Sequence, residues 1–258
     1  MPIDFTDPAN RSTYSGRTAD RSWHQAMAGW VDPAGRTVAD VGCGGGVYCH
    51  AWLDLGAARV IGVDSSRPLL DAARADGDRP GLSFLAGDAA ATGLADGSVD
   101  VVFERALVHH IADLRPVAAE AFRVLSPGGR YVVQDRVAAD VTQPPSSRHV
   151  RGWFAVVHPR LTAIELARRP DPAAVTTALT AAGFTDLQQT TLWETRRVHP
   201  DPEQLLAEIR GRVGRSILHE LDDAELTELV DRMRAELPAG EPVVEQDRWT
   251  VWTATRPA

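Results

Sequence analysis

Lysine is absent from this chain of 258 residues, because all 27 of its basic residues are arginine. Without lysine there is no Schiff-base nucleophile and no lysine-dependent phosphate loop. The 35 acidic residues outnumber the basic ones and leave a net charge of −8. Since affinity for nucleic acid comes from clustered positive charge, we expect no nucleic-acid partner.

Cysteine is scarce, and long apolar runs are missing. Cys43 and Cys49 cannot form a disulfide framework, and no cysteine and histidine cluster has zinc spacing, so we expect no metal. No run approaches the roughly 18 consecutive apolar residues of a membrane span, and the first residues do not resemble a signal peptide. With 44% apolar residues, the chain is expected to be a globular, cytoplasmic protein.

The first half of the chain alternates between short strand-like runs and segments with helical spacing. The strand-like runs are expected at residues 36–41, 59–63, 82–85, 99–103 and 131–133. Near-continuous apolar strands between helices are typical of a parallel sheet that is covered on both faces. We therefore predict an α/β fold with a doubly wound, Rossmann-like, mostly parallel sheet.

Residues 137–258 change in character. Residues 138–170 have no clean periodicity, so we expect a loop with short helices there. A helix is predicted after Asp171, which would cap it, and strands are predicted at 187–194 and 249–253 with two more helices between them. Helical insertions are thus expected after the fifth strand and between the last two strands.

The most informative segment follows the first predicted strand, where Asp40 precedes glycines at positions 42, 44, 45 and 46. A strand that runs into glycines and then a helix lets the backbone approach a ligand closely. A dinucleotide fingerprint would need its third glycine at Val47, and the Asp40 carboxylate would repel a pyrophosphate. An ammonium or sulfonium ligand would be attracted instead.

Two more acidic residues follow the next predicted strands. Asp64 closes the second strand, where a carboxylate can accept hydrogen bonds from both ribose hydroxyls, although it could also cap the next helix. Asp88 follows the third strand, in a Gly-Asp pair that is also common in turns. Three carboxylates at successive strand ends favour a cationic nucleoside over a phosphorylated one.

In these motifs the sequence resembles the class I S-adenosylmethionine-dependent methyltransferases, and most of all the branch that includes enzymes of ubiquinone and menaquinone biosynthesis. The first motif of the family, acid-x-Gly-x-Gly-x-Gly, matches residues 40–46. The family's ribose acid matches Asp64, and its adenine-proximal acid matches Asp88. Two later segments also resemble this branch, at 99–113 and 123–129.

The resemblance implies that S-adenosyl-L-methionine is the cofactor and S-adenosyl-L-homocysteine the product. It also implies a set of cofactor-binding residues: Asp40, Gly42, Cys43, Gly44, Asp64, Ser65, Asp88, Ala89 and Arg105. Cys43 and Ala89 would contribute backbone groups. The sequence departs from the family pattern at Glu104 and Arg105, where a small or polar residue is common, so the contact to the methionine part is expected to differ there.

Methyl transfer from a sulfonium needs orientation, exclusion of water and, for some acceptors, a base. His109 follows the fourth predicted strand at its carboxyl end, where α/β sheets bind ligands, and could take a proton from a hydroxyl or phenol. We predict His109 as the catalytic residue. The alternative is that His109 and His110 only pack or cap the segment before Asp113. Glu104 is a second candidate base, unless it pairs with Arg105.

Residues 1–35 precede the first strand, and in related enzymes such a segment folds over the cofactor as a lid. It could instead form an amphipathic helix on the sheet edge. Tyr14 is the predicted lid residue. Trp153 and His158 lie in an aromatic and apolar segment that could line an acceptor pocket, so residues 137–258 are expected to form the acceptor side.

We therefore predict one domain over residues 1–258, with a cofactor-binding core at 36–136. It would transfer a methyl group to a partly apolar small molecule, with O-methylation preferred over N- and C-methylation. Two alternatives stay open: a non-catalytic S-adenosylmethionine-binding module and, less favoured because of Asp40 and Val47, an NAD(P)-dependent oxidoreductase. The sequence indicates neither the acceptor nor the oligomeric state.

Overall fold

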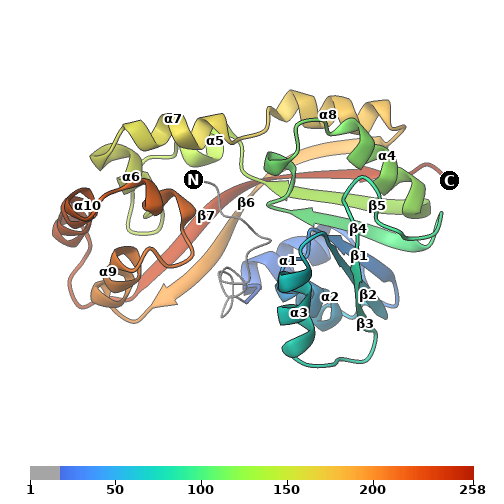
Figure 1. The fold of residues 1–258 in the computed structure, drawn as a ribbon, viewed down its shortest axis with the longest axis horizontal. Helices are drawn as coiled ribbons and strands as arrows, with labels where there is room; N and C mark the ends of the chain where they lie inside the picture. The colour runs from blue at the N-terminus through green and yellow to red at the C-terminus, as the bar shows by residue number, and fades with distance from the viewer. Residues whose placement is uncertain (1–17) are drawn as a thin grey trace.

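The computed structural model describes residues 18–258, and its strands form one seven-stranded sheet of order β3-β2-β1-β4-β5-β7-β6 (Figure 1). The strands are β1 (Thr37–Val41), β2 (Arg59–Asp64), β3 (Leu82–Ala86), β4 (Val99–Arg105), β5 (Leu125–Asp135), β6 (Thr185–His199) and β7 (Val243–Thr255). Strands β1 to β5 are parallel, whereas β7 pairs antiparallel with both β5 and β6. The predicted doubly wound, mostly parallel α/β fold is confirmed.

Helices cover both faces of this sheet (Figure 1). One face carries α1 (Arg21–Trp30), α2 (Val47–Asp54) and α3 (Arg67–Ala75), and the other carries α4 (Arg115–Val124) and α8 (Pro172–Ala181). Each face has its own apolar cluster. Trp23 and Trp52 are fully buried on the first face, and Val124 and Leu179 are buried on the second. Two buried layers follow from strands that are apolar on both sides.

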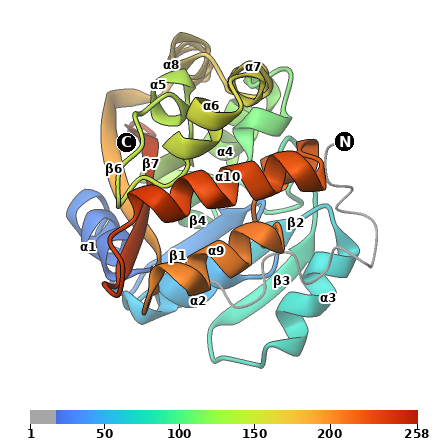
Figure 2. The same ribbon diagram turned by 90° about the vertical axis from the view of Figure 1, so that its left-hand side faces the viewer.

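Strands β6 and β7 continue past the other strands and carry a group of helices that we call the cap (Figures 1 and 2). The cap consists of α5 (Ala138–Val141), α6 (Gly152–Val157), α7 (Arg160–Ala167), α9 (Pro202–Arg210), η3 (Ser216–Glu220) and α10 (Asp223–Glu236). It has a third apolar cluster, to which the fully buried Leu205 and Leu229 belong. Both predicted insertions are therefore confirmed.

The ends of several elements follow from local chemistry. Asp171 and Asp201 cap α8 and α9 by accepting hydrogen bonds from backbone N–H groups of the first turn. Strands β6 and β7 are longer than the sequence predicts, because antiparallel pairing continues from the sheet into the cap, where β6 lacks a regular apolar alternation. Within residues 18–258, no helix is long and apolar enough to cross a membrane.

Candidate active site

The glycine-rich loop joins β1 to α2 at the carboxyl edge of the sheet. Gly42, Gly44 and Gly46 have φ angles of 75°, 52° and 81°, in the left-handed region that favours glycine. The N–H groups of Gly42 and Cys43 donate to the carbonyl of Val63 at 2.7 and 3.1 Å and hold the loop against β2. A Cβ atom on Gly44 would meet nothing within 4 Å, so the loop leaves open space beside its backbone.

Asp64, the last residue of β2, faces this loop. Its Oδ2 accepts a hydrogen bond from the N–H of Gly44 and its Oδ1 one from the N–H of Ser66, each at 2.8 Å. Each carboxylate oxygen can accept more than one hydrogen bond, so Asp64 can fix the loop and still bind hydroxyl groups. Ser65, the neighbouring predicted residue, is exposed at the same edge.

Asp40 lies beneath the loop and is 2% exposed. Its Oδ2 accepts a hydrogen bond from the Cys49 thiol at an Sγ–Oδ2 distance of 3.2 Å. Burial raises the pKa of Asp40 to about 7, with a contribution from Asp64, although the Cys49 hydrogen bond and the Arg105 charge act in the opposite direction. A bound cation would favour the charged form of this carboxyl group.

Asp88 lies in an exposed turn after β3. Its Oδ1 accepts a hydrogen bond from the N–H of Ala90 at 2.8 Å, and its backbone forms an isolated bridge with Ala91. These contacts are those of the tight turn that a Gly-Asp pair also predicts. Ala89 is half-buried against the core. A role for Asp88 and Ala89 in adenine binding stays a prediction.

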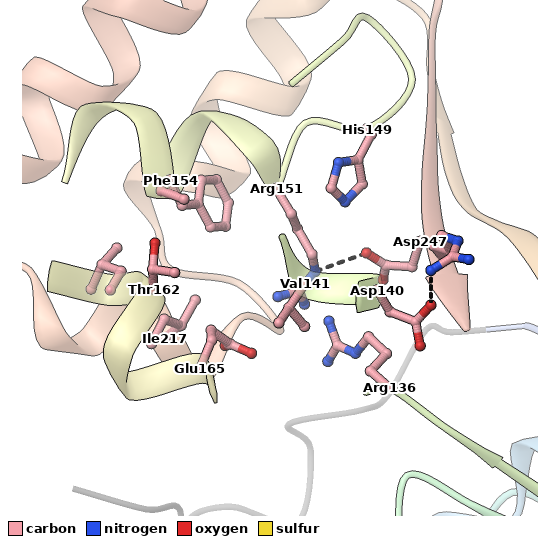
Figure 3. Close-up of a pocket in the computed structure, with 13 residues that line it drawn as sticks. Arg136, Asp140, Val141, His149, Arg151, Phe154, Thr162, Glu165, Ile217 and Asp247 are labelled. Carbon is pink, nitrogen blue, oxygen red and sulfur yellow. Dashed lines mark hydrogen bonds and ion pairs between the residues drawn. The ribbon is translucent and has the colours of Figure 1, made fainter. Parts of the chain in front are cut away.

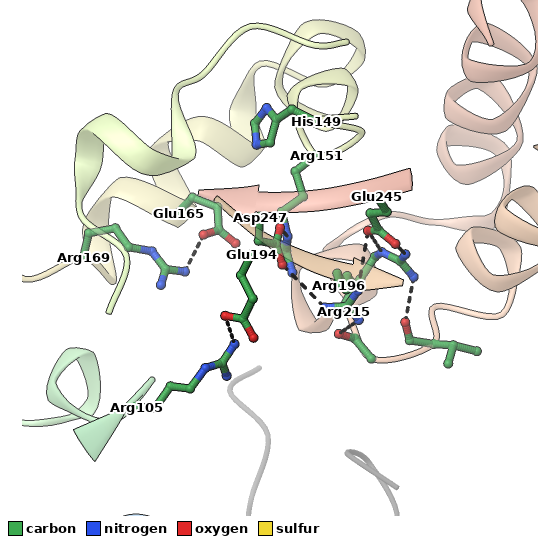
Figure 4. Close-up of polar contacts among 12 residues, drawn as sticks. Arg105, His149, Arg151, Glu165, Arg169, Glu194, Arg196, Arg215, Glu245 and Asp247 are labelled. Atoms are coloured by element: carbon green, nitrogen blue, oxygen red, sulfur yellow. Dashed lines mark hydrogen bonds and ion pairs between the residues drawn. The ribbon is translucent and has the colours of Figure 1, made fainter. Parts of the chain in front are cut away.

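Arg105, the last residue of β4, forms an ion pair with Glu194 of β6 at an Nη2–Oε2 distance of 2.9 Å (Figure 4). Its guanidinium carbon lies 4.4 Å from the ring centroid of Tyr48 and 4.1 Å from that of Trp249. Burial alone would lower the pKa of Arg105, but the charge of Glu194 raises it above its ordinary value. The guanidinium is thus fixed between two aromatic rings and one carboxylate.

Glu194 joins this arginine to three other elements. It accepts hydrogen bonds from Tyr48 of α2 at 2.5 Å and from Gln134 of β5 at 2.8 Å. Gln134 in turn accepts a hydrogen bond from the Trp23 indole of α1 at 3.1 Å. Residues 21–30 therefore form a helix packed on the sheet, Tyr14 lies outside the described residues, and a lid role for residues 1–35 stays a prediction.

His109 lies in the short helix η2 (Val108–His110), just beyond β4. Its Nδ1 is 2.9 Å from both carboxylate oxygens of Asp135, the last residue of β5, and its backbone N–H donates to Oδ2 at 3.2 Å. Burial alone would raise the pKa of Asp135, but the hydrogen bond and charge of His109 lower it below its ordinary value. An ionised carboxylate only accepts hydrogen bonds, so Nδ1 carries a proton that points to Asp135, and Nε2 is the ring nitrogen left for another partner.

The surroundings of His109 distinguish it from its neighbours. His109 lines an open groove of about 590 Å³. Partial desolvation and the electrostatic interaction with His109 lower the pKa of His110 to about 4. Burial raises the pKa of Glu104 to about 8, and this side chain is hydrogen bonded to Tyr131. The alternative in which Glu104 pairs with Arg105 does not hold, since Arg105 pairs with Glu194 and successive residues of a strand point to opposite faces of the sheet.

Trp153 and His158 lie at the two ends of α6 and contact α10. The Nε2 atom of His158 is 2.8 Å from the carbonyl oxygen of Glu225, and the Trp153 ring lies 5.6 Å from the guanidinium of Arg232. These contacts hold α6 against α10. An acceptor-binding role for the two residues stays a prediction.

The glycine loop and its two carboxylates fit a cationic nucleoside. Gly44 leaves open space, Asp64 offers hydrogen-bond acceptors, and the buried Asp40 lacks a lysine or arginine partner within ion-pair distance in the described part of the chain. Among residues 18–258, no group of three or more His, Cys, Asp or Glu side chains could hold a metal ion. The donor set therefore suits an organic cation such as a sulfonium.

Sequence reasoning missed Asp135, Gln134 and Glu194. Asp135 and Gln134 close the fifth strand, and polar residues at a strand's carboxyl end were a usable signal. Glu194 lies in an edge strand without regular alternation, so its only signal was a carboxylate next to Trp193.

Comparisons with known proteins agree with this geometry. Residues 39–133 match a family model described as a methyltransferase domain. The nocamycin O-methyltransferase of Saccharothrix syringae is 32% identical over 210 residues, which are 71% of this chain and 69% of that protein. The malonyl-[acyl-carrier protein] O-methyltransferase of Serratia marcescens is 27% identical over 172 residues. That match covers 60% of this chain and 66% of that one.

The chain spans less than two thirds of the length of three curated relatives that it matches, with 34%, 44% and 66% covered. Among solved structures, Haemonchus contortus phosphoethanolamine N-methyltransferase 2 in complex with S-adenosyl-L-methionine superposes with a TM-score of 0.61 at 18% identity. The superposition covers 99% of this chain and 60% of that one, and it shows a shared fold. The match to the Saccharothrix syringae enzyme extends over more than two thirds of both proteins. The chain therefore belongs to the class I S-adenosylmethionine-dependent methyltransferases.

Proposed function

We propose that this chain transfers a methyl group from S-adenosyl-L-methionine to a hydroxyl group of a partly apolar small molecule, with His109 as the general base. The observation that carries the proposal is the hydrogen bonding of His109 Nδ1 to both oxygens of the buried Asp135. When bound, the cofactor supplies the methyl group on an activated sulfonium. The residues of the protein then have to hold the cofactor, orient the acceptor and remove the proton of the acceptor hydroxyl.

Binding of the cofactor falls to the glycine loop and the acidic residues at the strand ends. Asp64 would accept hydrogen bonds from the ribose hydroxyls, and Asp40 would place a negative charge beneath the cationic part of the ligand. Arg105 forms an ion pair with Glu194, so its contribution to this site would be to hold the end of β4 against β6.

His109 would remove the proton of the acceptor hydroxyl through Nε2. Asp135 orients the ring and stabilises the imidazolium that forms, in the manner of other His-Asp pairs. A base of this kind contributes roughly 10²- to 10⁴-fold to the rate. A hydroxyl acceptor gains most from such a base, because an alcohol or phenol is a weak nucleophile until it loses its proton, whereas a neutral amine is already nucleophilic.

A small-molecule acceptor is supported by charge. The chain has a net charge of −8, and many of its arginines form ion pairs with acidic side chains, so a continuous basic surface for nucleic acid is not expected. Two relatives with substantial coverage are O-methyltransferases by name.

Calorimetric titration with S-adenosylmethionine, S-adenosylhomocysteine, NADH and NADPH tests the cofactor. We expect micromolar binding of the two adenosyl ligands alone. Binding of a nicotinamide nucleotide instead would favour the oxidoreductase alternative and overturn the proposal.

Transfer itself is tested with methyl-labelled S-adenosylmethionine and a panel of phenols, alcohols and hydroxy acids. Label should appear on oxygen, and His109→Ala should slow its appearance while S-adenosylhomocysteine still binds. His110→Ala is the matched control, because the low pKa of His110 makes it a weak base. Full activity of His109→Ala would show that this histidine has a structural role and is not the base.

A further inference from the structure

A small cavity lies between the end of β5, the cap helices α5 to α7, and β7 (Figure 3). Its volume is about 30 Å³, which is room for roughly two water molecules or one small polar group. Phe154, Leu161 and Ile217 form apolar parts of its wall. The other lining side chains are mainly charged, so their pairing decides what the cavity can hold.

Three carboxylates line the cavity, and each has an arginine partner. The ion pairs are Asp140 with Arg248 at 2.6 Å, Asp247 with Arg151 at 2.8 Å, and Glu165 with Arg169 (Figures 3 and 4). Within each pair the charges compensate one another. The acidic residues around the cavity are therefore already matched.

Arg136 is one of three arginines that line the cavity, with Arg151 and Arg248, and the fourth arginine of the group, Arg169, contributes only as the partner of Glu165. It has no ion pair in the part of the chain that the structure describes, and its Nε and Nη1 atoms are buried without a hydrogen-bond partner. Its guanidinium carbon lies 5.0 Å from the Trp249 ring, and Figure 3 shows the side chain reaching in among the cavity residues. Counted with Arg169, four arginines thus face three carboxylates, and Arg136 is the one that has no ion-pair contact.

The electrostatics agree with this count. Burial, and then the charge of Arg151, lower the pKa of Arg136 to about 9, although Asp247 and Glu165 act in the opposite direction. Buried N–H groups without hydrogen bonds, such as Nε and Nη1 of Arg136, are costly, and proteins normally satisfy them. A bound anion would supply both the missing charge and the missing acceptors.

We propose that the cavity beside Arg136 binds a carboxylate group of the methyl acceptor. This inference rests on the proposed function and adds the substrate class, an acceptor with one carboxylate next to an apolar group. The guanidinium fork matches a carboxylate, and the small volume and single excess charge fit a monoanion better than a phosphate.

The position of Arg136 places this anion site beside the groups assigned to methyl transfer. Arg136 directly follows Asp135, which holds His109. The guanidinium carbons of Arg136 and Arg105 both lie near the Trp249 ring, at 5.0 and 4.1 Å from its centroid. An acceptor anchored at Arg136 is therefore one aromatic side chain away from Arg105 at the end of β4.

The experiment is a fluorine NMR titration in chloride-free buffer, with the protein saturated with S-adenosylhomocysteine. Trifluoroacetate is the probe, and trifluoroacetamide is its neutral counterpart. We expect trifluoroacetate to bind about tenfold more tightly or better, because a charge-assisted hydrogen bond contributes that much. Equal affinities for the two probes would overturn the inference.

Arg136→Gln should abolish the preference for the anion, whereas Arg136→Lys should keep part of it. Arg234→Gln is the matched control, because Arg234 is an exposed arginine that pairs with Glu203. If Arg136→Gln still bound trifluoroacetate more tightly than trifluoroacetamide, the anion would bind elsewhere and the assignment would be contradicted.

Thermal unfolding separates binding from a structural role. Arg136→Gln should unfold at the same temperature as the unaltered protein or higher, since it removes a half-buried charge that has no ion pair in the described part of the chain. A large fall in its unfolding temperature would show that Arg136 is a structural residue. Calorimetry with S-adenosylhomocysteine on the unaltered protein distinguishes the two proposals. If the protein did not bind S-adenosylhomocysteine but still preferred trifluoroacetate, the proposed function would be overturned and the anion site would stand.

Discussion

The ring of His109 is held by a carboxylate that comes from the neighbouring strand, with Nδ1 at 2.9 Å from both oxygens of Asp135. The two residues are 26 positions apart, and they meet because β4 and β5 are parallel neighbours whose carboxyl ends lie at one edge of the sheet. In the proposed reaction, Nε2 is therefore the ring atom that would take the acceptor's proton.

Substituting Asp135→Asn should lower the turnover rate by about a hundredfold or more, because an amide cannot stabilise the imidazolium. Binding of S-adenosylmethionine should be unchanged. Turnover of methyl-labelled S-adenosylmethionine measures the effect, and Asp113→Asn, at an exposed carboxylate that pairs with Arg115, is the control. Near-normal turnover of Asp135→Asn would mean that the histidine is not oriented for catalysis.

Substituting Asp64→Ala should weaken S-adenosylmethionine binding by about ten- to a hundredfold. The change removes acceptors for the ribose hydroxyls and also the bond that holds the N–H of Gly44. Calorimetry measures the loss, with Asp71→Ala on the exposed face of α3 as control. Unchanged affinity would refute the ribose assignment.

Cofactor binding should release a proton near pH 6. Because the pKa of Asp40 is about 7, this carboxyl is mostly protonated at that pH, and a cationic ligand favours its charged form. Affinity should therefore rise between pH 6 and 8. Calorimetry in buffers of different ionisation enthalpy counts the protons, and Asp40→Asn should release none and bind more weakly. Equal proton release by the variant would exclude Asp40 as the titrating group.

Substituting Glu104→Gln should stabilise the protein at high pH. The unfolded chain loses the Glu104 proton near its ordinary pKa of 4.5, whereas the folded protein keeps it up to about pH 8. Folding stability therefore falls as pH rises through this window, by at most about 5 kcal/mol for this group. Denaturant unfolding at pH 5, 7 and 9 should show the variant gaining over the unaltered protein.

The control for that comparison is Glu203→Gln, an exposed glutamate paired with Arg234, whose loss should not produce the same gain. If Glu104→Gln and the unaltered protein had parallel stability profiles from pH 5 to 9, the raised pKa would be refuted.

The elements of the cofactor half were predictable because their signals are local. The strand-to-glycine transition at residues 40–46 and the acidic ends of β2 and β3 are each contained in a few consecutive residues. The opposite directions of Glu104 and Arg105 were also predictable, since alternation along a strand follows from geometry.

The polar network around Glu194 was not predictable in this way. Tyr48 and Glu194 are 146 positions apart, and they meet only because β7 inserts antiparallel between β5 and β6. Likewise, Arg136 lacks an ion pair only because each nearby carboxylate pairs with a different arginine in the folded protein. Neither set of contacts is marked in the sequence by a periodic pattern or by a fixed spacing between the residues.

The continuous β6–β7 ladder has a consequence for how this enzyme could diversify. Its pairing runs from Thr185 opposite Thr255, inside the cofactor-binding sheet, to His199 opposite Val243, inside the cap. The cap is therefore not a detachable module, because exchanging it would mean rebuilding two strands of the scaffold that also supports the cofactor site. A change of acceptor would more readily arise from replacing single side chains that face the acceptor, while the strands and helices stay as they are.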